Sequence, residues 1–109
     1  MNDVVRPIRW DRLNQQEAER VVREYAEDSA NIIFGTHSLD REEERDISTT
    51  ECLRILREGF VEPEPKMNKN GEWEVIVTKT LRTQRSASAV TIILREDKKL
   101  FVKTLMWRD

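Results

Sequence analysis

The chain's single histidine, His37, is followed by Arg41 and Arg45 at four-residue intervals. In a helix, residues four apart share a face, so His37 and Arg41 would lie together, with Arg45 turned by about 80°. Histidine titrates near neutral pH and serves as an acid or a base, while the planar fork of arginine suits bidentate contact with phosphate. The spacing therefore predicts a phosphate site in this charged segment.

Metal-independent cleavage of RNA, which is implied by the family resemblance given below, is one reaction that would use such residues. It needs a base for the 2′-hydroxyl, an acid for the leaving 5′-oxygen and cations for the phosphate. His37 is the candidate acid or base, and the second proton-transfer group would be a carboxylate, a lysine or the substrate itself. Glu44, seven residues on, is spaced to orient the imidazole or to offset the positive charge. From the strands, Thr104 can donate a hydrogen bond to phosphate, and further positive charge can come from Lys79, Arg82 and Lys103.

An ordinary structural interpretation of the same residues stays open. His37 can cap or flank a helix, the two arginines can pair with neighbouring carboxylates in solvent, and Thr104 is a common residue in strands. Other chemistry has less basis, because one His and one Cys far apart in sequence form no zinc pattern, and no glycine-rich phosphate loop is present. The acidic run at 40–46 is interrupted by arginines, so we expect no metal and no cofactor.

Two capping boxes predict where helices begin. Asn14 with Glu17 starts a helix over 14–30, whose apolar residues recur at helical spacing: Ala18, Val21, Val22, Tyr25 and Ala26. A short charged helix is expected from Thr36 or Ser38 to Arg45. Ser48 with Glu51 then starts a helix that contains Cys52, for which we expect a buried thiol in a reducing compartment. Gly59 is expected to end this helix in the left-handed conformation.

The second half of the chain changes to strand periodicity. Residues 31–35 predict an edge strand or an extended connector, and the prolines of 62–65 disfavour helix and central strand. After an Asn-Gly turn in 68–71, strands are predicted at 72–81, 89–95 and 100–107, joined by short segments and therefore antiparallel. The predicted fold is α+β, with N-terminal helices packed on a three- or four-stranded antiparallel meander.

The pattern of the last strand does not decide which face of the sheet the helices cover. Strict alternation places Leu100, Val102, Thr104 and Met106 on one face, and Phe101, Lys103, Leu105 and Trp107 on the other. Both faces are largely apolar. Either helices cover both, or one face meets a partner, or one forms a partly apolar cleft.

Composition indicates one domain over residues 1–109. Charged residues make up 37% and hydrophobic residues 38% of the chain. The start lacks the apolar core of a signal peptide, and the longest apolar run, 89–94, is too short for a membrane span, so a cytoplasmic protein without membrane contact is expected. The net charge is −2, but residues 65–109 carry 10 basic and 5 acidic side chains, which permits a basic face on this half.

The segments THSLDREEERDISTTECLRILREGFV (36–61) and KLFVKTLMW (99–107) resemble the small bacterial domain-of-unknown-function family 4258. The resemblance covers roughly 32–107 and leaves 1–31 as an N-terminal helical extension. That family is grouped with RelE-like and BrnT-like toxin domains of the BECR ribonuclease fold class. The resemblance implies a helical layer on a four-stranded antiparallel sheet, cleavage of RNA, and an antitoxin partner. Its motif positions fall on His37, Arg41, Arg45 and Thr104.

Three functions follow as hypotheses. The first is a small metal-independent ribonuclease of the toxin type, whose acidic helix region and low pI depart from typical toxins. The second is a non-catalytic domain of the same fold that binds a protein or forms a homodimer through an apolar sheet face. The third is RNA binding without cleavage. Trp73 and Trp107 would suit base stacking, although aromatic residues in strands are usually core, and Trp10 is expected to dock the leading segment.

Overall fold

The computed structural model describes residues 7–35, 47–81 and 84–108. Four of the predicted site residues, His37, Arg41, Arg45 and Arg82, lie outside these ranges, as do Glu44 and the predicted charged helix. The described part is an α+β fold with two α-helices, a short 3₁₀ helix and six strands.

Helix α1 (Gln15–Ala26) begins as predicted. The Asn14 side chain accepts a hydrogen bond from the Glu17 amide at 2.8 Å, and Glu17 accepts one from the Asn14 amide at 3.1 Å, which completes the capping box. All five residues of the predicted apolar stripe are buried. The helix ends before residue 30, because the Asp28 side chain caps a separate 3₁₀ helix, η1 (Ser29–Asn31), by accepting from Ala30.

Helix α3 (Thr49–Glu58) has the second predicted capping box, between Ser48 and Glu51, and buries Cys52. The predicted conformation of Gly59 is wrong, because its φ of −79° and ψ of 178° are extended rather than left-handed. Steric crowding explains why residue 59 is a glycine. A Cβ at this position would lie 2.5 Å from the Ile55 carbonyl oxygen and 2.8 Å from that of Thr78.

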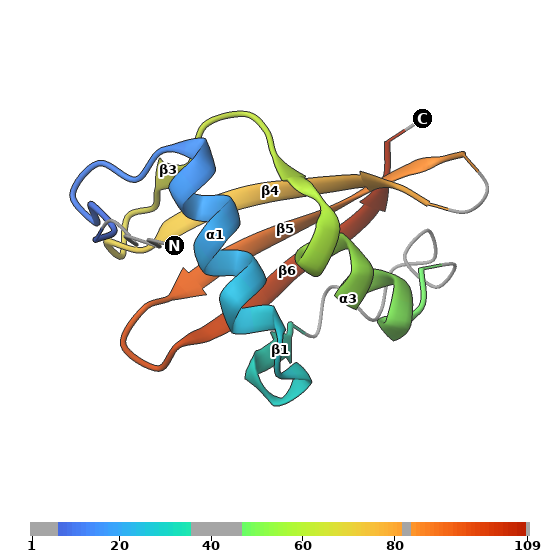
Figure 1. Cartoon of the computed structure of the whole chain (residues 1–109), viewed down its shortest axis with the longest axis horizontal. Helices are drawn as coiled ribbons and strands as arrows, with labels where there is room; N and C mark the ends of the chain where they lie inside the picture. Colours follow the sequence, from blue (N-terminus) through green and yellow to red (C-terminus); the bar gives the residue numbers. More distant parts are fainter. Residues whose placement is uncertain (1–6, 36–46, 82–83, 109) are drawn as a thin grey trace, which may run out of the picture.

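The sheet is larger than the predicted three or four strands. The predicted meander is present as β4 (Trp73–Thr80), β5 (Ser86–Leu94) and β6 (Lys99–Trp107). Three short strands extend it: β1 (Ile32–Phe34) pairs in parallel with β6, while β2 (Phe60–Val61) and β3 (Lys66–Met67) pair antiparallel with β4. The order is β1-β6-β5-β4-β2 (Figure 1). Strand β1 confirms the edge strand that was one of the two alternatives for residues 31–35. The two-residue strands β2 and β3 were not predicted, because they are too short to show a period.

A β-bulge changes the alternation along β6. Val90 of β5 lies opposite Thr104, while the next residue, Thr91, lies opposite Val102, so Lys103 is an extra residue. A bulge shifts every later side chain to the other face. Leu105 and Trp107 therefore share the face of Leu100 and Val102, and the predicted face sets are wrong beyond Val102.

Both α-helices cover the same face of the sheet (Figure 1). The strand residues on that face are mostly buried, including Val75, Val77, Ala89, Thr91, Ile93, Leu100, Val102 and Leu105. The opposite face is half-buried, apart from the fully buried Ser88, at Ile76, Val90, Ile92, Phe101, Thr104 and Met106. We call this second face, which no described helix covers, the open face. Within the described ranges, helices thus cover one face of the sheet and not both.

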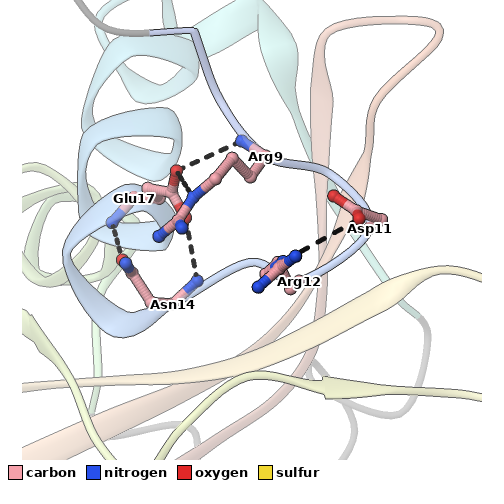
Figure 2. Close-up of polar contacts among 5 residues, drawn as sticks. All are labelled: Arg9, Asp11, Arg12, Asn14 and Glu17. Atoms are coloured by element: carbon pink, nitrogen blue, oxygen red, sulfur yellow. Dashed lines mark hydrogen bonds and ion pairs between the residues drawn. The ribbon is translucent and has the colours of Figure 1, made fainter.

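The N-terminal segment docks on the helical side of the sheet. Arg9 donates to the Glu17 carboxylate from its backbone amide at 3.1 Å and from Nε at 3.3 Å (Figure 2). Trp10 packs against the core as predicted, and its carbonyl oxygen accepts a hydrogen bond from Nε1 of Trp73 at 2.7 Å. Neither helix of the described ranges is long and apolar enough to cross a membrane.

We expect Gly59→Ala to lower the free energy of unfolding by about 2 kcal/mol, because the added methyl group meets two backbone oxygens that cannot move independently of α3 and β4. Urea denaturation measures the change. The control is Gly71→Asn, at a turn position with φ of 78° and open space, where asparagine tolerates the conformation. Equal stability of the two variants would contradict the steric explanation.

Glu17 should contribute to the dependence of stability on pH. Desolvation raises the pKa of its carboxyl, but hydrogen bonds from Arg9 and Asn14 outweigh it, so the pKa is lowered from 4.5. A carboxyl with a lowered folded-state pKa stabilises the fold above its unfolded pKa, and this contribution is lost as pH falls through the folded value. The free energy of unfolding should therefore fall less steeply with acid in Glu17→Gln than in wild type. The control is Glu24→Gln, at an exposed position of α1. Its free energy of unfolding should fall with acid as steeply as that of wild type.

Candidate functional site

The bulge in β6 brings two predicted site residues together on the open face. Thr104 lies opposite Val90 on this face, and the extra residue Lys103 reaches across β5 to Glu74, whose register also places it there. The Lys103 ammonium lies 3.4 Å from the Glu74 carboxylate, with side-chain exposures of 52% and 28%. A cation and a hydroxyl are thus neighbours in sequence and in space.

Lys79 lies on the other side of the sheet. It shares a cross-strand row with Ala87 and Trp107, on the face that the helices cover. Its ammonium lies 3.3 Å from the carboxylate of Glu58 at the end of α3. The sheet therefore separates Lys79 from Lys103, and the structure does not bring them to one ligand.

The charged strand residues of the open face are mostly basic. By register, Lys66 of β3 lies beside Glu74, and Lys99 of β6 lies opposite Leu94 on the same face. Within the described strands, three lysines including Lys103 thus face one carboxylate. This agrees with the basic balance of residues 65–109.

A set of hydroxyl groups on the open face was missed by the sequence reasoning. The Thr78 and Ser88 hydroxyls are 2.6 Å apart, and those of Thr80 and Ser86 are 3.2 Å apart. Both pairs connect β4 to β5; the Thr78–Ser88 pair lies in the row next to Thr104, and the Thr80–Ser86 pair lies one row further along the same face. The sequence does show hydroxyl residues at alternate positions of two consecutive strands, which indicates that they share a face. Which of them pair across the strands depends on register, which the sequence does not show.

The rest of the open face is apolar. Ile76, Val90, Ile92 and Phe101 form its centre. At the two edges, Ile33 lies beside Phe101 and is 39% exposed, and Phe60 lies opposite Thr78 and is 62% exposed. Exposed apolar side chains at both margins are typical of a surface that meets a partner.

Gly35 connects the end of β1 to the middle of β6. Its amide donates to the Val102 carbonyl oxygen at 2.9 Å, and a Cβ on Gly35 would lie 2.9 Å from the Phe101 ring. Val102 precedes Thr104 by two residues in β6, and Gly35 precedes His37 by two residues in the sequence. The first described range, 7–35, therefore ends beside the strand that carries Thr104.

Other reactive groups are scarce in the ranges that the structure describes. Those ranges hold no group of three or more His, Cys, Asp and Glu residues with the geometry of a metal site. Burial raises the pKa of the Cys52 thiol to about 12, so the thiol stays protonated and is a poor nucleophile. This cysteine belongs to the core.

Comparison of the chain with protein-family models, curated proteins and solved structures found no match. The resemblance to family 4258 thus stays a prediction.

We expect the Cys52 thiol not to react with a thiol reagent such as Ellman's reagent in the native protein at pH 8, because the thiol is both buried and protonated. In denaturant it should react fully, since exposure restores its ordinary pKa. Fast reaction of the native protein would contradict the buried, neutral thiol.

Proposed function

We propose that the open face binds the phosphodiester backbone of RNA and that this domain, with the segment 36–46, cleaves it without a metal ion. The observation that carries the proposal is the bulge, which places Lys103 and Thr104 side by side on a face with an excess of lysines. An ammonium group and a hydroxyl donor are a suitable pair for two oxygens of one phosphate.

Lys103 must exchange its carboxylate partner for phosphate. An ion pair at this degree of exposure is worth about 0–1 kcal/mol, so the exchange requires little free energy. Thr104 would donate a hydrogen bond to a second phosphate oxygen. The proton-transfer role falls to His37 and charge stabilisation to Arg41 and Arg45, as the family resemblance implies. The hydrogen bond from the Gly35 amide to Val102 supports this arrangement, because it holds Gly35, two residues before His37 in the sequence, beside the strand that carries Thr104.

The test is incubation of the purified chain with bulk RNA in the presence of a chelator. We expect cleavage by wild type, and a loss of about a hundredfold or more in His37→Ala, because general acid–base catalysis contributes at least that much. Lys103→Gln and Thr104→Val should each slow cleavage about tenfold by removing one phosphate contact.

Lys79→Gln is the matched control, since it removes the same charge from the opposite face of the sheet. It should leave the rate unchanged. Intact RNA with wild type would contradict cleavage, and equal effects of Lys79→Gln and Lys103→Gln would contradict the open face as the binding surface.

Self-association is a second candidate function, favoured by the exposed apolar residues. Of the three large hydrophobic side chains that are exposed in the described residues, Ile33 lies on the open face by register, and so does Phe60 at the edge of the sheet, where its ring centroid also lies 6.0 Å from the guanidinium carbon of Arg23 in α1. A second copy of the chain presents the same apolar strip, so two open faces can bury one another in an isologous pair. This candidate needs no catalytic group.

Sedimentation equilibrium across a series of protein concentrations tests for this dimer. This second candidate, unlike RNA binding by the open face, predicts a wild-type dimer, and monomers for Ile33→Lys and Phe60→Lys, because a buried, unpaired ammonium group is costly. Met67→Lys is the control, because Met67 is 50% exposed but lies opposite Trp73, on the other face. A monomeric wild type at every concentration would exclude the dimer.

A further inference from the structure

A pocket of about 610 Å³ lies at one end of the sheet, away from the Lys103 and Thr104 pair. It is bounded by the N-terminal segment at Trp10, by the turn before β4 and by the turn that joins β5 to β6. Its volume lies within the range of pockets that hold small ligands or single side chains. The predicted phosphate-site residues that the structure describes, Lys79, Lys103 and Thr104, do not line it.

Two tryptophans and a methionine form its apolar walls. Trp10 and Trp73 are half-buried and are joined by the 2.7 Å hydrogen bond from Nε1 of Trp73 to the Trp10 carbonyl oxygen. Met67, which is 50% exposed, adds a flexible thioether. Such walls suit the aliphatic part of a long side chain.

The Trp10 ring already holds a cation. The Arg95 guanidinium carbon lies 4.7 Å from the ring centroid, within the range of a cation–π contact. The internal arginine shows that a flat or compact cation fits on this ring. It also means that an incoming cation competes with Arg95.

The charges around the pocket are mostly negative. Four carboxylates line it, on Asp11, Glu72, Glu96 and Asp97, against the single guanidinium of Arg95. Asp11 has only a 3.9 Å ion pair with the highly exposed Arg12. Among the described residues, neither Glu96 nor Asp97 forms an ion pair. This field attracts cations and repels phosphate.

We propose that this pocket binds an arginine or lysine side chain presented by a peptide of a protein partner. The cationic head lies on Trp10 among the carboxylates, the stem lies along Trp73 and Met67, and Arg95 swings out to solvent. The pocket does not depend on the RNA proposal, because its charge is opposite to that of the open face and its residues are different.

The probe is a short peptide with two arginines between glycines, acetylated and amidated at its ends. Its control is the same peptide with citrulline, which has nearly the same shape without the charge. We expect the arginine peptide to shift the indole N–H signals of Trp10 and Trp73 in ¹⁵N-correlated NMR spectra, and to leave Trp107, at the far end of β6, unchanged. Single Trp→Phe substitutions assign the three signals. Equal shifts with citrulline, or no shift at Trp10, would overturn the proposal.

Arg95→Gln separates this mechanism from nonspecific charge attraction. Removing the internal competitor should tighten peptide binding about threefold, consistent with a cation–π contact at an exposed site. Glu96→Gln with Asp97→Asn should weaken binding about threefold. The matched control is Glu24→Gln with Glu27→Gln, two exposed carboxylates of the α1 end, which should change nothing. Unchanged or weaker binding by Arg95→Gln would overturn the proposal, whatever the outcome with RNA.

Discussion

The β-bulge at Lys103 is the constraint on which the two faces of this domain depend. One extra residue between Val102 and Thr104 moves Leu105 and Trp107 to the side of the helices. With strict alternation, Leu105 would point away from α1 and α3, and the core would lose a side chain that is now 2% exposed. Lys103 is itself the extra residue, and because of the bulge both Lys103 and Thr104 lie on the open face. Packing on one side and polar chemistry on the other thus have one cause.

The open face combines two kinds of surface that serve different ligands. Its hydroxyl groups, Thr104 and lysines suit an anion, whereas Ile33, Phe101 and their neighbours suit an apolar partner. The Glu74 carboxylate moderates the first role, because it already neutralises Lys103 at 3.4 Å. Because this ion pair is weak, the open face can accept phosphate at small cost in free energy. It can also be buried against a partner with these two charges still paired.

The N-terminal helix is part of the same core as the sheet. Val21 and Val22 of α1 are buried with Leu100 and Val102 of β6, in one hydrophobic cluster. The segment before α1 adds the hydrogen bond between Trp73 and Trp10, so residues far apart in sequence form the wall of the second pocket. The molecule therefore presents a basic face along its strands and an acidic pocket at one end, which suits two ligands of opposite charge.

The sequence by itself determined the local features, because their causes lie within a few residues. Both capping boxes, the buried stripe of α1 and the three-stranded meander are local patterns of hydrogen bonding and hydrophobic period. Only the tertiary structure decided the bulge, the extended conformation of Gly59, the two-residue strands β2 and β3, and the separation of Lys79 from Lys103. These depend on cross-strand register and on steric contact between distant segments, such as Gly59 against Thr78, which no local period encodes.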